Sequence, residues 1–352
     1  MSGPVLALGE VMLRFDPGEE RIATARSFRV WEGGGEYNVA KALASCFGRP
    51  ARVVTALVDD PLGQLVAREA RAGGVDTSAV RWVPAYGPLG HARTGLNFVE
   101  RGAGVRGALG VSDRSSSAAS QLRPEDLDWD LLLTGASWLH TGGVFAALSD
   151  TTALVAEQAL DAAARHGVRT SYDTNYRPSL WRHRGGREAA LLLDERLASR
   201  ADVVFGALGL DAEDHGELAT VDELAEALAR LGESRGHDQL LVSSWRRVPS
   251  AVANDFSGAA WSRATGAVTG PVLAGVPVLD RIGSGDAYAA GVLHRLLDAE
   301  DHRDPGADAL REGLALGVAA GALTMSTPGD SLCASAAEVE ALARGGTAHV
   351  RR

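Results

Sequence analysis

The chain has very little lysine and very little cysteine. Among 35 basic residues in a length of 352, the only lysine is Lys41, and it follows Ala40 instead of glycine. A Walker A loop needs Gly-Lys-Ser/Thr to hold nucleotide phosphates, so phosphate binding here would have to use backbone amides, arginine or a metal ion. The two cysteines, Cys46 and Cys333, show no C-x-x-C spacing, which is typical of a reducing compartment and predicts a cytoplasmic protein.

Long hydrophobic runs and excess positive charge are also missing. The longest mostly apolar stretch, residues 313–325, is too short to span a bilayer, and the chain reaches Glu10 without the basic start of a signal peptide. The formal charge of -10 disfavours nucleic acid and anionic membranes as partners. The length suits one large α/β domain, so we expect a single domain over residues 1–352.

Buried strands and amphipathic helices alternate along most of the chain. The apolar patterns predict strands at 4–8, 52–57, 137–139, 169–172, 201–205, 239–243 and 259–261, and helices at 37–47, 63–72 and 150–166. This order predicts an α/β fold with a mostly parallel sheet and helices on both faces. Ligands of such sheets bind at the carboxyl ends of the strands.

Two segments, residues 11–33 and 91–117, interrupt this alternation. Both contain short stretches in which apolar and polar residues alternate, as in strands with one wet face. We expect them to form a small β-sheet lid over the strand ends, which would exclude water from the site and offer exposed strands for homodimer formation. The alternative is that both segments are surface insertions without a functional role.

The sequence Asp-Arg-Ile-Gly-Ser-Gly-Asp over residues 280–286 places glycines and a carboxylate at the start of a helix. Gly283 and Gly285 permit unusual backbone angles, and the first amides of the helix, including that of Ser284, have no partners within it. Such a turn binds phosphate, and Asp286 would be a base beside it. The simpler alternative is an aspartate that only caps the helix.

A second glycine-rich turn, residues 32–38, opens another helix. Gly34 and Gly35 let a ligand approach the backbone closely, and Asn38 offers hydrogen-bond donors and an acceptor that suit sugar hydroxyls. The two turns together resemble the two signatures of the ribokinase-like, phosphofructokinase-B-type carbohydrate kinases. Further similarity, at residues 9–15, 173–181 and 326–330, is to the 2-keto-3-deoxygluconate kinases within that family.

The resemblance implies a three-layer α/β/α fold and an ATP- and Mg²⁺-dependent kinase for a sugar acid, with a monovalent cation as a further candidate cofactor. The expected reaction converts 2-keto-3-deoxygluconate to its 6-phosphate, with Asp286 as base and the 283–285 amides stabilising the transferred group. The alternatives are a kinase of a neutral sugar, such as fructose or ribose, and a sensor without catalytic activity.

Further site residues are expected on the lid and at the strand ends. Arg177 carries a planar fork that can grip a substrate carboxylate, and Arg114 in the lid is a second candidate; a core salt bridge to Asp173 is the simpler explanation of Arg177. The resemblance implies that Asn97 contacts the sugar from the lid; the alternative is an exposed strand residue without such a contact.

The residues expected to bind the nucleotide and its magnesium ion depart from the family pattern. Ser243 and Arg246 stand where the nucleotide-binding loop is expected, and the usual Asn-x-x-Glu magnesium pattern lacks its Asn, which leaves Asp211 and Glu213 as candidate metal ligands.

Overall fold

The main sheet of the protein is mostly parallel. A computed structural model describes residues 3–84, 92–103, 105–206 and 218–346. The sheet order is β13-β12-β11-β10-β9-β8-β1-β4-β5, with β14 paired to β12. All neighbours from β5 to β11 pair in parallel, and the strands beyond β11 pair antiparallel. The strands are β1 (Val5–Leu8), β4 (Ala51–Asp59), β5 (Val80–Pro84), β8 (Trp138–Gly142), β9 (Arg169–Asp173), β10 (Val203–Phe205), β11 (Leu240–Ser250), β12 (Ala253–Ser262), β13 (Gly266–Thr269) and β14 (Leu273–Pro277).

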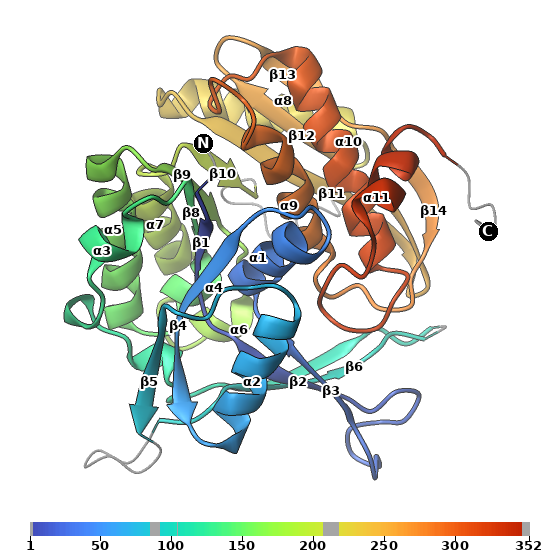
Figure 1. Cartoon of the computed structure of the whole chain (residues 1–352). Helices are drawn as coiled ribbons and strands as arrows, with labels where there is room; N and C mark the ends of the chain where they lie inside the picture. Colours follow the sequence, from blue (N-terminus) through green and yellow to red (C-terminus); the bar gives the residue numbers. More distant parts are fainter. Residues whose placement is uncertain (1–2, 85–91, 104, 207–217, 347–352) are drawn as a thin grey trace.

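Helices cover both faces of this sheet (Figure 1). One face carries α3 (Trp129–Leu133), α4 (Gly143–Ala146), α5 (Asp150–His166), α7 (Gly186–Ala198) and α8 (Val221–Arg235). The other carries α1 (Gly35–Ser45), α2 (Pro61–Ala72), α9 (Ser284–Leu296), α10 (Ala307–Thr324) and α11 (Ala336–Ala343). The short α6 (Pro178–Trp181) packs on α7. The expected α/β/α layers are therefore confirmed.

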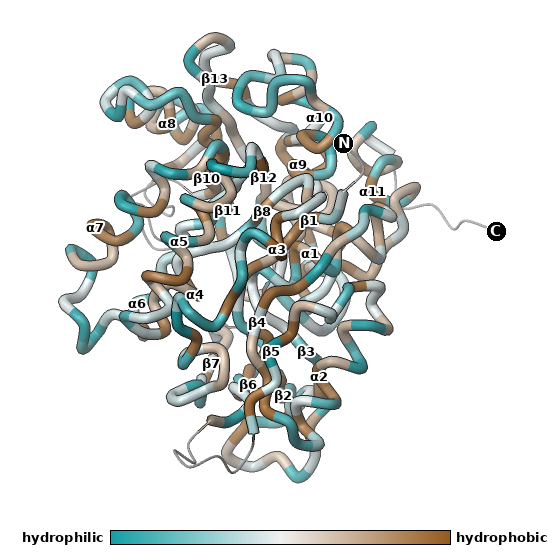
Figure 2. Tube along the Cα trace, turned by 60° about the vertical axis from the view of Figure 1, so that its left-hand side comes forward, coloured by the Kyte–Doolittle hydropathy of each residue, from teal (hydrophilic) through white to brown (hydrophobic). Residues whose placement is uncertain are grey.

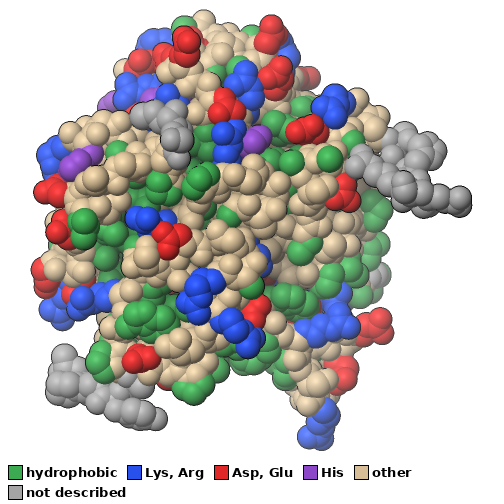
Figure 3. Space-filling model, viewed as in Figure 1, with side chains coloured by type: hydrophobic (Ala, Val, Ile, Leu, Met, Phe, Trp, Pro, Cys, Tyr) green, Lys and Arg blue, Asp and Glu red, His purple; other side chains and the backbone are tan. Residues whose placement is uncertain are grey.

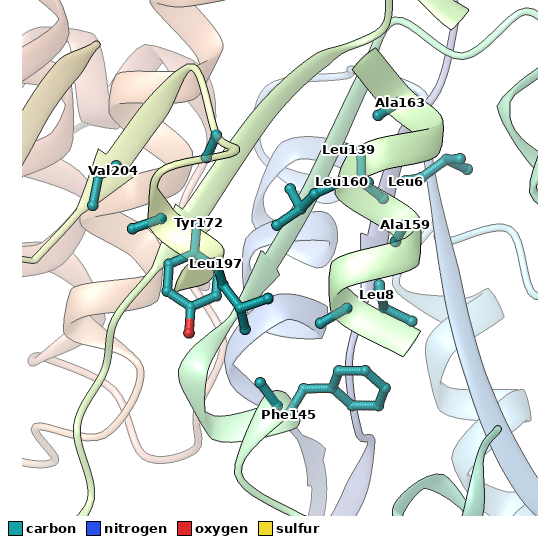
Figure 4. Close-up of a cluster of buried hydrophobic side chains, with 14 of the residues drawn as sticks. Leu6, Leu8, Leu139, Phe145, Ala159, Leu160, Ala163, Tyr172, Leu197 and Val204 are labelled. Carbon is teal, nitrogen blue, oxygen red and sulfur yellow. The ribbon is translucent and has the colours of Figure 1, made fainter. Parts of the chain in front are cut away.

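The alternation of side chains along the strands produces the two layers of core. In β1, Leu6 and Leu8 point into the layer that contains α5, whereas Val5 packs against the layer of α1 and α9. Figure 4 shows Ala159, Leu160 and Ala163 of α5 beside the leucines of β1. In Figure 2 the outer helices show both hydrophobic and hydrophilic residues, as expected for helices with one face on a sheet.

The two interrupting segments form a second sheet, of order β3-β2-β6-β7. Its strands are β2 (Met12–Asp16), β3 (Arg29–Gly33), β6 (Leu96–Glu100) and β7 (Leu109–Asp113). The expectation of a small separate sheet is confirmed, and its role as a lid stays a prediction. None of the helices in the described part is long and apolar enough to cross a membrane.

The hairpin of β11 and β12 is longer than the sequence predicts. Strands were expected at 239–243 and 259–261, but pairing continues from Leu241 opposite Trp261 to Ser250 opposite Ala253. Arg246, Arg247 and Pro249 interrupt the apolar alternation, which is why the extension is hard to recognise in the sequence.

Candidate active site

The turn before α9 has the geometry of an anion site. Gly283 has φ 78°, and a Cβ there would lie 1.8 Å from the carbonyl oxygen of Asp330, so only glycine fits. No side chain caps the helix, and the amides of Gly285 and Asp286 have no hydrogen-bond partner among the described residues. The amide of Ser284, expected to be free, donates to the carbonyl of Arg281 at 3.4 Å. The free amides of Gly285 and Asp286 point to where an anion would bind at the positive end of the helix.

Asp286 contacts the other glycine-rich turn instead of capping its own helix. Its Oδ2 accepts a hydrogen bond of 2.7 Å from Nδ2 of Asn38, whose Oδ1 accepts one of 3.3 Å from the Gly34 amide. At Gly35, an added Cβ would lie 3.7 Å from Oδ1 of Asp286. The two motifs, far apart in sequence, therefore meet at one carboxylate, as a shared site requires.

Three carboxylates lie close enough to influence one another. Burial, together with the charge of Asp286, raises the pKa of Glu36 to about 8 and that of Asp173 to about 7. Burial also raises the pKa of Asp286, against the opposing effects of the Asn38 hydrogen bond and the Arg177 charge. A carboxylate with a raised pKa is a stronger base than an ordinary aspartate.

Three arginines near this cluster form no ion pair within the described residues: Arg177, Arg246 and Arg281. Partial burial and the charges of Arg281 and Arg177 lower the pKa of Arg246 to about 10. The side chain of Arg177 is exposed, and among the described residues its guanidinium donates only to the carbonyl of Tyr176, at 3.3 Å. Its charge acts on Asp173 without a direct salt bridge. Unpaired positive charges around an amide turn are typical of a site for a multiply charged anion.

The lid candidates have protein partners in this structure. Arg114 pairs with the buried Glu10, with Nε 2.8 Å from Oε2. The positive charge of Arg114 also acts to lower the pKa of Glu36. Oδ1 of Asn97 accepts a hydrogen bond of 3.1 Å from the hydroxyl of Ser112. Direct roles of Arg114 and Asn97 in substrate binding stay predictions.

The nucleotide-side candidates lie on β11 or outside the described residues. Ser243 is buried, and its carbonyl accepts a hydrogen bond of 3.1 Å from the hydroxyl of Tyr288 in α9. Arg246 lies farther along the same strand, on the extended hairpin. Asp211 and Glu213 fall outside the described residues, and no group of three metal-ligating side chains occurs in the described ranges.

A pocket of about 400 Å³ adjoins the turn at residues 280–286, which we call the phosphate turn after the role predicted for it from the sequence. It lies between the β6–β7 turn, the tip of the β11–β12 hairpin and the segment 278–282, and Arg101 and Arg281 contribute positive charge to its apolar walls. On the face shown in Figure 3, acidic and basic side chains are interspersed. The pocket is therefore a candidate for the part of a ligand that extends from the turn.

Some residues of the site were not predicted. Glu36 belongs to the glycine-rich turn at residues 32–38, and Arg281 belongs to the turn at residues 280–286. The local sequence pattern of these motifs did not show that the two residues lie near the same site. Asp173 was considered only as a salt-bridge partner. Their proximity depends on the order of the strands, which the local sequence does not specify.

Comparisons with known proteins agree with this arrangement. The family model described as pfkB family carbohydrate kinase matches residues 4–337. The chain is 32% identical to 2-dehydro-3-deoxygalactonokinase of Haloferax volcanii over 100% of both chains. It is 29% identical to probable fructokinase-6 of Arabidopsis thaliana, over 92% of this chain and 78% of that protein. The crystal structure of 2-dehydro-3-deoxygluconokinase from Thermotoga maritima superposes with a TM-score of 0.85 at 30% identity, covering 97% of this chain and 100% of that one. The chain therefore belongs to the pfkB family of carbohydrate kinases.

Proposed function

We propose that the protein transfers the terminal phosphoryl group of ATP to the terminal hydroxyl of a 2-keto-3-deoxy sugar acid, with 2-keto-3-deoxygluconate as the first candidate. The relatives from Haloferax volcanii and Thermotoga maritima carry the names of kinases for such acids. The two names differ in the stereochemistry of the sugar, so the galactonate form is part of the same substrate class.

The observation that carries this proposal is a group of arginines near Asp286, namely Arg177, Arg246 and Arg281, whose charges act on one another and which form no ion pair with any described residue. A sugar acid and ATP together bring a carboxylate and a triphosphate, and a neutral sugar would leave part of this positive charge unmatched. Arg177 follows β9 and its charge acts on Asp286, so it is placed to attract a carboxylate beside the reacting hydroxyl. Arg246 lies on the hairpin of β11 and β12, and Arg281 lies in the phosphate turn.

The proposed mechanism uses Asp286 as the base. Asn38 orients the carboxylate through the 2.7 Å hydrogen bond, and the raised pKa makes Asp286 a better proton acceptor than an ordinary aspartate. The free amides of Gly285 and Asp286, with the adjoining Gly283 and Ser284, would hold the phosphoryl oxygens as charge builds on them. Positioning of the hydroxyl against the phosphate would contribute most of the acceleration.

Magnesium would enter bound to ATP, as part of the substrate, and would neutralise charge on the phosphates. Asp211 and Glu213 remain the residues that we propose as protein ligands of this magnesium ion. A monovalent cation also stays a prediction, which turnover in potassium compared with tetramethylammonium salts would test.

A kinase of a neutral sugar is the second candidate, because a relative with 29% identity is named as a fructokinase. The two candidates differ in the role of Arg177. A sensor without catalysis is the weakest candidate, since Asp286 and its Asn38 partner are both in place.

The test is ADP formation by the full chain with ATP, magnesium and a panel of acidic and neutral sugars. We expect turnover with a 2-keto-3-deoxy acid, and in Arg177→Ala a KM for that acid raised by roughly tenfold or more. Any residual activity on neutral sugars should keep its KM. Turnover confined to fructose or ribose, or equal weakening towards all sugars, would contradict the proposal.

A further inference from the structure

A buried arginine outside the proposed reaction joins the lid sheet to the phosphate turn. Arg14 of β2 is 1% exposed, and its guanidinium contacts three buried carboxylates. One terminal nitrogen donates to Asp280 at 2.5 Å and lies 3.7 Å from Asp16, and the other donates to Asp330. These carboxylates come from β2, from the segment before α9 and from the loop after α10.

Two of the three carboxylates shape the phosphate turn. Asp280 accepts hydrogen bonds from the amides of Ile282 at 3.2 Å and Gly329 at 3.3 Å, so it fixes both the entry to the turn and the neighbouring loop. The backbone carbonyl of Asp330 lies against Gly283, at the place where a Cβ would collide. The position of the free amides therefore depends on where Asp280 and Asp330 are held.

Arg14 is the charge that lets these carboxylates lie close together. Asp280 and Asp330 are 3% and 7% exposed, so water screens their repulsion poorly. Burial and the charges of Asp280 and Asp286 raise the pKa of Asp330 to about 6, even though Arg14 opposes that shift. Without the guanidinium, the pair would separate, take up water or bind a proton, and each change would move the turn.

The same side chain is fixed to the lid. Arg14 pairs along the backbone with Trp31 of β3 and with Asn97 of β6, and its guanidinium lies 5.9 Å from the centre of the Trp31 ring. Gly329, with φ 102°, packs against that ring. A continuous set of contacts therefore connects β6, which carries Asn97, with the phosphate turn before α9.

We propose that Arg14 is a positioning residue that holds the phosphate turn in its binding geometry and links it mechanically to the lid sheet. The inference rests on the proposed kinase function and deepens it. Arg14 does not touch the substrates; it acts through Asp280 and Asp330. Its two terminal nitrogens hold two carboxylates at once, which a lysine ammonium cannot reproduce in the same geometry.

The test compares Arg14→Lys and Arg14→Met with the wild-type full chain. Binding of a non-hydrolysable ATP analogue is measured by calorimetry, together with kcat, both KM values and Tm. We expect Arg14→Lys to weaken analogue binding and lower kcat, each by roughly tenfold or more, because small displacements of a positioned group are costly. The KM for the sugar should change less.

Arg21→Met is the matched control, because Arg21 is also a lid arginine, is largely exposed and pairs with Glu100. It should bind the analogue as the wild type does. If Arg14→Met does not fold, Arg14→Lys decides the question.

A folded Arg14→Lys with unchanged analogue affinity and kcat would overturn the inference, even if its Tm were lower. The proposed function fails separately: a wild type that binds the analogue but phosphorylates no sugar acid would contradict that proposal, while loss of analogue binding in Arg14→Lys would still support the positioning role.

Discussion

At the scale of single residues, the hydrogen bond between Asn38 and Asp286 shows that Asp286 does not act as the cap of its own helix. A capping carboxylate accepts from amides of its own helix, whereas Asp286 accepts from a side chain on α1. The amides of Gly285 and Asp286 have no partner in the part of the chain that the structure describes. Both residues, with Gly34, Gly35 and Gly283, were predicted from the sequence because their motifs are local. Glu36, Asp173 and Arg281 were not, because only the folded sheet brings them together.

Glu36 gives a prediction about pH and stability. Its pKa is raised from 4.5 to about 8 in the folded protein, so between these values the folded state holds a proton that the unfolded chain has released. This contribution makes the free energy of unfolding fall as pH rises, by at most about 1.4 kcal/mol per pH unit. In Glu36→Gln, which cannot ionise, urea unfolding should show a smaller fall between pH 4.5 and pH 8.

The exposed Glu125→Gln is the control for that experiment and should keep the wild-type dependence on pH. Equal slopes for wild type and Glu36→Gln would show that Glu36 does not hold its proton in the folded state.

At the scale of elements, the start of α9 and the hairpin of β11 and β12 differ in how well they could be predicted. The start of α9 follows from glycine, serine and aspartate within a few residues, each with a local physical reason. The hairpin depends on cross-strand pairing and on β14, which adds to its edge. Its arginines and Pro249 hide the strand pattern, so the sequence alone did not place Arg246 on a strand.

The glycines of the phosphate turn give the prediction at this scale. In Gly283→Ala the methyl group would collide with the backbone of Asp330, and φ 78° is strained for alanine. We expect the free energy of unfolding to fall by about 2 kcal/mol or more. Gly285 has open space around it, so Gly285→Ala should fold at least as stably as the wild type. Urea unfolding of both variants checks this, and equal losses would contradict the turn geometry.

At the scale of the whole molecule, the alternation of strands and helices predicted the layers and the mostly parallel sheet, and the two segments that interrupt it predicted the separate small sheet. The alternation did not predict the strand order or the pairing of β2 with β6, because those depend on contacts between distant segments. Homodimer formation through the lid stays a prediction. The edge strand β7 is exposed along its length, including Leu109 and Val111, and sedimentation equilibrium would test whether a second copy covers it.

In the proposed reaction, Asp286 removes the proton from the hydroxyl of a sugar acid while the adjacent turn holds the phosphate. The most direct measurement is kcat for Asp286→Ala with ATP and 2-keto-3-deoxygluconate, together with its urea unfolding midpoint. We expect kcat to fall by roughly 10²- to 10⁴-fold, with the unfolding midpoint near that of the wild type. Turnover close to the wild-type rate in the folded variant would contradict the proposed role of Asp286.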